Sequence, residues 1–377
     1  MIRSSLIFAW LLLWVFSCNT SADEVTIVHN GSHLELEGEI LIETQNDNGL
    51  LFQSRDGKLW VVEQEQLKEK SADEKEVAPF KKDELAKQLK EEMGDGFRVH
   101  DAGNFVIAYN TSQPYARWVA GLYRKLERGF DFYWSRNKFK LDDRPEFPLP
   151  IIIFKNRAEY ERYMKKDIGV VTSMLAYYSL ESNRVIMFDL TADTVPPGAN
   201  LNERKIGEVL DNPRAIPMVA TIIHEGTHQL MFNYGMQTRY ADTPLWINEG
   251  LAAYFETPDL GAKNGWRKIG KVNFLRLGPF LQFAKNRPAD SLKKMMATDD
   301  GFKNASTLDN YAQAWAFNYF LLNRHKKAYV KYLSHMSEKP RLVSDEPEQR
   351  ISEFLQFFDQ TLEELDKEFL RYIRKLN

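Results

Sequence analysis

Polar and apolar residues alternate along two stretches near the start of the chain, LELEGEILIET (residues 34–44) and LLFQSRDGKLWVVEQ (residues 50–64). Alternation with a period of two predicts strands that bury one face. We therefore predict a small β module over residues 23–66. A few strands with so few large apolar residues are marginally stable alone. We expect the module to dock on another surface or to serve as a binding arm for a polymer or protein partner.

Charged residues dominate the next segment, residues 67–96. Such a composition is typical of linkers, and the spacing near residues 82–93 favours a solvent-exposed helix. We predict a charged linker that contains this one helix and acts as a spacer.

Aliphatic and aromatic residues become denser from Phe97 onward, so we place the main domain at residues 97–377. In its α/β part, residues 97–235, short apolar runs that predict strands alternate with segments of helical spacing. In residues 236–377 nearly every segment has a helical pattern. Strands mixed with helices, and then helices alone, indicate an α+β fold. We expect a mixed sheet with the candidate active-site helix, followed by a mostly helical C-terminal half and preceded by the β module.

The first 22 residues have the pattern of an export signal. Arg3 is followed by an apolar run over residues 6–16, and small and polar residues then lead to a predicted cleavage after Ala22. The run is too short to span a bilayer comfortably, although an uncleaved N-terminal anchor is an alternative. We expect a secreted, periplasmic or cell-envelope protein with no stable membrane span after signal removal. The one cysteine, Cys18, would leave with the signal, so the mature chain would form no disulfide.

Composition narrows the class of function. The 377 residues are 44% hydrophobic and 13% aromatic, which is enough for a substantial core. The formal net charge is only -3, which gives no general attraction to polyanions. We therefore expect no nucleic-acid partner.

The segment TIIHEGTHQLMFNYG, residues 221–235, combines core-type side chains with two histidines and a glutamate. On a helix, residues four apart project from nearly the same face, so His224 and His228 can point at one metal ion. Glu225 lies close enough to reach a water on that metal without binding the metal itself. This is an H-E-x-x-H pattern, which supplies two zinc ligands and a general base.

A second helix is predicted over TPLWINEGLAAYFE, residues 243–256, with Thr243 as N-cap and Pro244 at the first helical position. Glu249 lies at its centre among large apolar side chains. A carboxylate in such surroundings needs a partner. A zinc ion with two histidine ligands and no third protein ligand would provide one.

With these residues the chain resembles the gluzincin metallopeptidases, the superfamily of thermolysin and the aminopeptidase N relatives. In that group H-E-x-x-H is followed, on the next helix, by a glutamate ligand. The form WINEGLA is most similar to peptidase-like members with no assigned substrate. The resemblance covers roughly residues 145–330. It implies hydrolysis of a peptide or protein substrate with one Zn²⁺ per chain, held by His224, His228 and Glu249, and with Glu225 as the general base.

The resemblance also implies roles for two flanking segments. The segment YYSLESNRVIMF, residues 177–188, lies where the superfamily has an edge strand that pairs with the substrate backbone. Tyr311 lies on a later predicted helix, where related enzymes often have a tyrosine that stabilises the oxyanion. Tyr311 could equally be a core residue, and Tyr177 and Tyr178 are alternatives for its role.

Two departures from the superfamily limit what can be transferred. The thermolysin-like pattern has an aspartate four residues after the glutamate ligand, where it supports a histidine. Position 253 here is alanine, and Glu256 is the nearest substitute. The aminopeptidase sequence G-x-M-E-N is absent, so recognition of a free N-terminus is not implied.

An alternative from another class is a catalytically inactive protein of metallopeptidase fold that acts as an envelope binding or scaffold module. A purely structural zinc site would need a fourth protein ligand, most often Cys or His. The mature chain has no cysteine, and its other histidines have no partner at ligand spacing. The pattern therefore favours a hydrolase over a structural site.

Overall fold

The chain divides into two compact units at the bond between Pro79 and Phe80. We describe each unit by itself. The computed structural model describes residues 22–44, 49–73, 77–196, 199, 201–261, 266–303 and 307–376. Apart from Ala22, the predicted signal peptide lies outside these residues.

The N-terminal unit is one antiparallel sheet with the strand order β4-β3-β2-β1-β5. Its first hairpin turns at Asn30 and Gly31, which both have positive φ, at 50° and 78°. An Asn-Gly pair of this kind closes a tight two-residue hairpin. The strands are β1 (Ala22–His29), β2 (Ser32–Glu43), β3 (Gly49–Ser54), β4 (Leu59–Glu63) and β5 (Leu67–Asp73).

Strand β5 corrects part of the predicted linker. Residues 67–73 were expected in the charged spacer, but they pair with β1 along its length. The composition is misleading here because β5 is an edge strand. Lysines such as Lys68 and Lys70 are common on edges, where they discourage pairing with other chains. The β unit therefore extends beyond the predicted limit at residue 66.

The second unit begins with a helix and is built around a mixed sheet with the strand order β6-β7-β8-β10-β9. Strands β7, β8 and β10 are parallel, whereas β6 and β9 pair antiparallel at the two edges. The mixed sheet predicted from the sequence is thus confirmed. Its strands are β6 (Arg98–Ala102), β7 (Phe105–Tyr109), β8 (Leu149–Phe154), β9 (Ala176–Tyr178) and β10 (Val185–Phe188).

Helix α1 (Lys82–Met93) forms where a helix was predicted. It is not only a solvent-exposed spacer, because part of it packs into the core of the second unit. Leu85 and Leu89 are buried in the core of the second unit. Glu92 forms a bidentate pair with Arg184, at 2.6 and 2.7 Å. The second unit therefore starts at Phe80 rather than at the predicted Phe97.

Helices cover both faces of this sheet. On one face lies α3 (Arg157–Ile168), whose Tyr160 ring contacts Phe188 of β10 with a centroid distance of 5.4 Å. On the other lies α5 (Ile216–Asn233), whose Phe232 stacks on Tyr178 of β9 at 5.6 Å. Helix α2 (Gln113–Arg136) packs beside α5, where the Tyr123 hydroxyl donates to the Ile222 carbonyl. A short helix, α4 (Glu203–Leu210), precedes α5.

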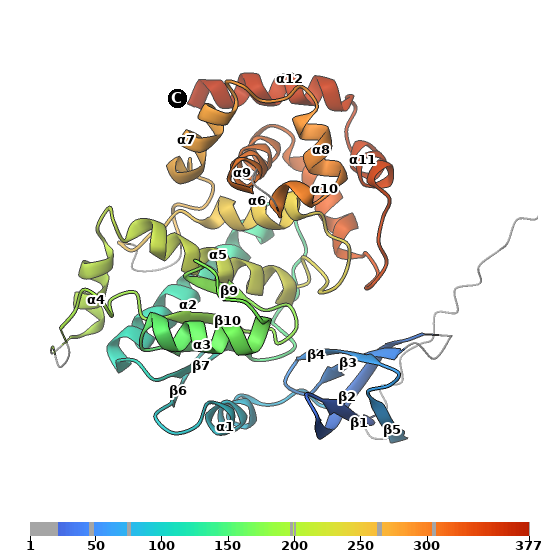
Figure 1. The fold of residues 1–377 in the computed structure, drawn as a ribbon. Helices are drawn as coiled ribbons and strands as arrows, with labels where there is room; N and C mark the ends of the chain where they lie inside the picture. Colours follow the sequence, from blue (N-terminus) through green and yellow to red (C-terminus); the bar gives the residue numbers. More distant parts are fainter. Residues whose placement is uncertain are drawn as a thin grey trace, which may run out of the picture. The chain divides into compact units, whose positions relative to one another are not determined.

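The C-terminal half is helical, as predicted, and its helices gather above the sheet in Figure 1. Helix α6 lies between the sheet-bearing part and this group. The helices are α6 (Leu245–Phe255), α7 (Phe274–Phe283), α8 (Ser291–Ala297), α9 (Thr307–Arg324), α10 (Lys326–Ser337), α11 (Pro347–Leu355) and α12 (Leu362–Ile373). The α+β class is confirmed. Within the described residues, none of the helices combines the length and apolar character needed to cross a bilayer.

The two units have separate apolar cores, and this predicts independent folding of the second. The core of the β unit contains Val25, Ile27 and Phe52, whereas the larger core begins at Leu85. We expect a chain that starts at Phe80 to unfold cooperatively in a thermal melt followed by circular dichroism, because its core is complete without the β unit. A gradual melt without a cooperative transition would contradict this.

Candidate metal centre

Helix α5 presents the predicted polar trio on an otherwise apolar helix. It ends at Asn233, and the chain then turns at Gly235, which has φ of 72°. His224 and His228 are each only 6% exposed. Buried polar groups need partners. The neighbours of these two imidazoles therefore show whether the imidazoles can bind a metal ion.

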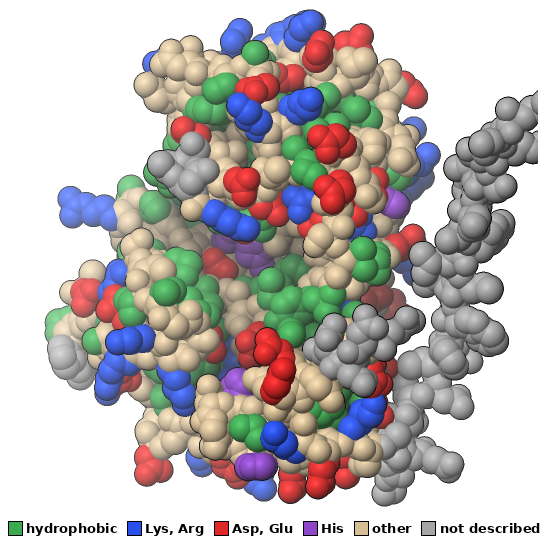
Figure 2. Space-filling model, turned by 45° about the vertical axis from the view of Figure 1, so that its right-hand side comes forward, with side chains coloured by type: hydrophobic (Ala, Val, Ile, Leu, Met, Phe, Trp, Pro, Cys, Tyr) green, Lys and Arg blue, Asp and Glu red, His purple; other side chains and the backbone are tan. Residues whose placement is uncertain are grey.

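The third candidate ligand, Glu249, reaches both histidines from α6. Its Oε2 lies 3.0 Å from Nε2 of His224 and 3.6 Å from Nε2 of His228. The two Nε2 atoms are 3.0 Å apart. In Figure 2, histidine side chains are visible at the bottom of a hollow beneath the C-terminal helices.

These separations fit a metal ion. Zinc bonds of about 2 Å place the ligand atoms of a tetrahedral site roughly 3.3 Å apart. The three ligand atoms lie within 4.8 Å of one another. His224, His228 and Glu249 therefore form a group that can hold a metal ion.

The outer nitrogen of each imidazole is also fixed. Nδ1 of His224 lies 2.7 Å from Oε1 of Glu256, and Nδ1 of His228 lies 2.8 Å from Oδ1 of Asn248. Such outer partners set the tautomer and direct Nε2 toward a metal. Glu256, which the sequence offered as the nearest substitute for an aspartate at position 253, thus supports His224.

Helix α7 and its N-cap residue, Asn273, contribute two side chains to the site that sequence reasoning missed. The guanidinium of Arg276 binds Glu256 through both oxygens, at 2.5 and 2.9 Å, and Nδ2 of Asn273 donates to Oε2 of Glu256 at 3.0 Å. The sequence did not identify these two residues, because they lie about 50 positions after His224 and belong to no recognised spacing pattern.

The charges of the group are strongly coupled. Burial alone would lower the pKa of His224, but its hydrogen bonds with Glu249 and Glu256 raise it to about 10. Burial would raise the pKa of Glu256, but Arg276 and His224 lower it to about 2. The pKa of Glu249 is likewise lowered, against the effect of burial, by both histidines. Without a metal, protonated His224 and the guanidinium of Arg276 together therefore balance the two carboxylates.

The side chain of Glu225, the predicted general base, extends from α5 to the edge strand β9. Its Oε2 accepts a hydrogen bond of 2.9 Å from the backbone N–H of Tyr178 in β9. Burial raises the pKa of the Glu225 carboxyl, although the charges of His224 and His228 oppose this. A raised pKa is the direction expected for a carboxylate that exchanges protons near neutral pH.

Of the three tyrosines considered, the structure brings Tyr311 to the site. Its ring lies 6.5 Å from that of His224, measured between centroids. Burial, the charges of Glu249 and Glu225 and a hydrogen bond with Glu249 raise the pKa of its hydroxyl well above 10. The hydroxyl of Tyr177 instead binds Asp167, and that of Tyr178 binds Asn183.

Close packing fixes α6 against α9 at the candidate ligand. A Cβ on Gly250, the residue after Glu249, would lie 2.0 Å from Nδ2 of Asn318 and 2.6 Å from the carbonyl oxygen of Ala314. Asn318 also donates to the carbonyl of Trp246, at 2.9 Å. Glycine at position 250 thus lets α9 approach the helix that carries Glu249.

The start of α6 corrects the predicted cap. The helix begins at Leu245, one residue later than expected, and Thr243 is not its N-cap. The N–H of Leu245 instead donates to Oδ1 of Asp299, at 2.9 Å. The cap comes from a residue far along the chain, which local sequence cannot reveal.

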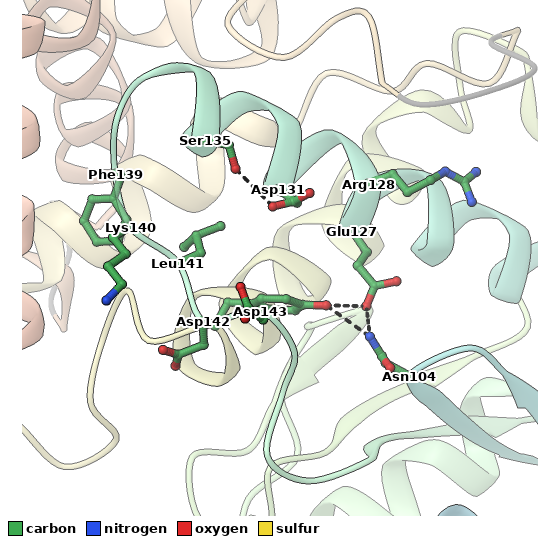
Figure 3. A pocket seen from close by; sticks show the side chains of 11 residues that line it. Asn104, Glu127, Arg128, Asp131, Ser135, Phe139, Lys140, Leu141, Asp142 and Asp143 are labelled. Atoms are coloured by element: carbon green, nitrogen blue, oxygen red, sulfur yellow. Dashed lines mark hydrogen bonds between the residues drawn. The ribbon is translucent and has the colours of Figure 1, made fainter.

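Tyr234, which follows the last residue of α5, lies beside a cavity of about 530 Å³ that is shown in Figure 3. The hydroxyl of Tyr234 and the amide of Asn104 both donate to Oε1 of Glu127 in α2, at 2.7 and 2.9 Å. These bonds tie the chain at the end of α5 to α2 and to the turn between β6 and β7. They stabilise the position of the helix that bears both histidines.

Comparison with known proteins identifies one family. Residues 218–343 match the model of a family described as "Protein of unknown function (DUF1570)". No curated protein matches the chain. The matched segment contains His224, Glu225, His228, Glu249 and Tyr311, whereas strand β9 lies outside it. The description of that family assigns no activity, and the resemblance to peptidases stays a prediction.

The pKa of His224 predicts a pH-dependent metal affinity. A metal ligand must lose its proton, and His224 is protonated below a pKa of about 10 in the metal-free site. Zinc affinity should therefore rise by about tenfold per pH unit between roughly pH 7.5 and 9. Competition with a chromophoric chelator measures this. Glu256→Gln, which removes one of the two carboxylates, should flatten the dependence. A flat profile for the wild type would contradict the assignment.

The α6–α9 contact predicts the effect of one added methyl group. Gly250→Ala should destabilise the protein by about 1–3 kcal/mol, because neither Asn318 nor the α9 backbone can yield without shifting a helix. Urea unfolding measures the change. Gly121→Ala in α2 is the matched control, since its Cβ would meet no atom within 4 Å. Equal stability of the two variants would show that the contact is not tight.

Proposed function

We propose that this protein is a zinc-dependent metallopeptidase. One observation supports this above the others: His224, His228 and Glu249 converge within metal-binding distance, while Glu225 lies beside them at an edge strand. The residues themselves favour metal-assisted hydrolysis of a carbonyl compound. The choice of a peptide bond rests on the resemblance to gluzincins.

Zinc is the metal that this set of donors fits best. Two imidazoles and one carboxylate match a catalytic zinc site, in which three protein ligands leave one position open. When bound, zinc lowers the pKa of a coordinated water to about 7 and polarises a carbonyl group. We expect one zinc ion per chain.

The protein's own residues handle the protons. The Glu225 carboxylate accepts the proton of the attacking water and then passes it to the leaving amine. Its hydrogen bond from the N–H of Tyr178, at 2.9 Å, fixes the direction of the carboxylate. The hydroxyl of Tyr311 keeps its proton at neutral pH, because the pKa of tyrosine is ordinarily about 10 and burial raises the pKa of this one further. It can donate that proton in a hydrogen bond to the developing oxyanion.

Strand β9 provides a place for the substrate backbone. It is the last strand in the order β6-β7-β8-β10-β9, so one of its sides has no neighbouring strand in this sheet. An extended peptide can add to such an edge through main-chain hydrogen bonds. Glu225 would then lie beside the bound backbone.

We further propose that the chain is exported to the cell envelope or secreted, on the basis of residues 1–22. The separate β unit then serves to bind a polymer or protein partner. If the metal fold is inactive, the protein acts instead as an envelope binding or scaffold module. This alternative, an inactive binding or scaffold module, is supported by one observation, the separate apolar core of the β unit.

The role of Glu225 separates these two hypotheses. Glu225→Gln should reduce peptide turnover by about 10²–10⁴-fold, because the amide cannot accept the proton. Zinc content should stay unchanged, since Glu225 is not one of the three ligands. Glu208→Gln, at an exposed i,i+4 pair on α4, is the matched control. Turnover is measured with a library of fluorescence-quenched peptides. A Glu225→Gln variant as active as the wild type would exclude the proposed mechanism.

A further inference from the structure

The last residue of α3 and the segment between α3 and β9 expose an unusual number of apolar side chains. Val170 and Val171 are 54% and 50% exposed, and Ile168 and Met174 are each 39% exposed. Single exposed apolar residues are normal on protein surfaces, whereas clusters of them mark contact sites. We call these four residues the apolar loop.

The apolar loop lies on the α3 side of strand β9. The N–H of Thr172 donates to Sδ of Met164 in α3, at 3.4 Å, so the loop folds back along that helix. The hydroxyl of Tyr177 donates to Asp167 at the end of α3, at 2.8 Å. The loop then leads directly into β9, which starts at Ala176.

The backbone of β9 alternates between its two sides. The N–H of Ser179 donates to the carbonyl of Arg184, at 2.8 Å, toward the β10 side. Because the direction reverses at each residue, the N–H of Tyr178 points away from β10, where it meets Glu225. Ala176, two residues earlier, presents its N–H and C=O on the same outer side.

From this geometry we propose that the outer edge of β9 binds an extended polypeptide whose alternate side chains are apolar and contact the apolar loop. Side chains of an added strand point alternately to the two faces of the sheet. Those on the α3 face meet Val170, Val171 and their neighbours. If the proposed function is right, the protein should also prefer to cleave substrates with this pattern, and that consequence rests on the proposed function. The binding of the polypeptide does not depend on it.

A polypeptide fits the loop better than a lipid surface does. The loop continues into β9, whose Tyr178 N–H bonds to Glu225, so the apolar side chains and the candidate site can contact the same extended ligand. Backbone pairing along β9 would supply affinity, and the loop would supply selection by side chain.

Two labelled octapeptides test the proposal, one with leucine at alternate positions and one with serine there. Binding is measured by fluorescence anisotropy with the zinc-loaded Glu225→Gln protein, so that turnover does not interfere. We expect the combined change Val170→Ser and Val171→Ser to weaken binding of the leucine peptide by about tenfold, because apolar contact area is lost. Binding of the serine peptide should change by less than about twofold.

Phe132→Ser is the matched control, because Phe132 is a 65% exposed apolar residue on α2. An equal loss of affinity in this control, or no loss in the loop variant, would overturn the proposal. So would a loop variant that binds peptides normally but loses binding to vesicles of anionic phospholipid.

The outcomes also separate this proposal from the proposed function. If the wild-type zinc protein binds and cleaves both peptides equally, the hydrolase stands and the role of the apolar loop is wrong. If the leucine peptide binds through the loop but is never cleaved, the binding proposal stands and the hydrolase is wrong.

Discussion

The structure depends on a row of alternating charges buried where α5, α6 and α7 meet. Arg276 binds Glu256, Glu256 binds Nδ1 of His224, and Nε2 of His224 faces Glu249. Burying any of these groups alone would cost several kcal/mol. Each has a partner of opposite charge only because three helices, far apart in sequence, hold fixed positions. A divalent cation in place of the proton on His224 would continue the same alternation.

The C-terminal helices are therefore part of the site. Helix α9 packs on Gly250 and supplies Tyr311, whereas α7 supplies Arg276. Asp299 caps α6 and is itself paired with Arg350, at 3.3 Å, in α11. Helix α6 is thus held at its start and along its length. The match to one family model, over residues 218–343, includes α7 and α9 as well as the two histidines.

The sequence predicted the features that depend on local pattern. The helix that presents both histidines and the mixed sheet followed by helices were correctly predicted, because periodicity determines them. Features that depend on distant contacts were missed. Nothing near Arg276 indicates that it reaches Glu256, and the charged residues of β5 resemble a linker because an exposed edge tolerates lysine. Tyr311 is placed at the site, but its catalytic role stays a prediction.

The most direct test is the zinc content of the purified chain, compared with His228→Ala and Glu249→Ala. The account predicts about one zinc ion per wild-type chain after reconstitution, lost or much weakened in both variants, while all three proteins give the same far-ultraviolet circular dichroism. An unchanged zinc content in Glu249→Ala, or no zinc in a folded wild-type chain, would contradict it.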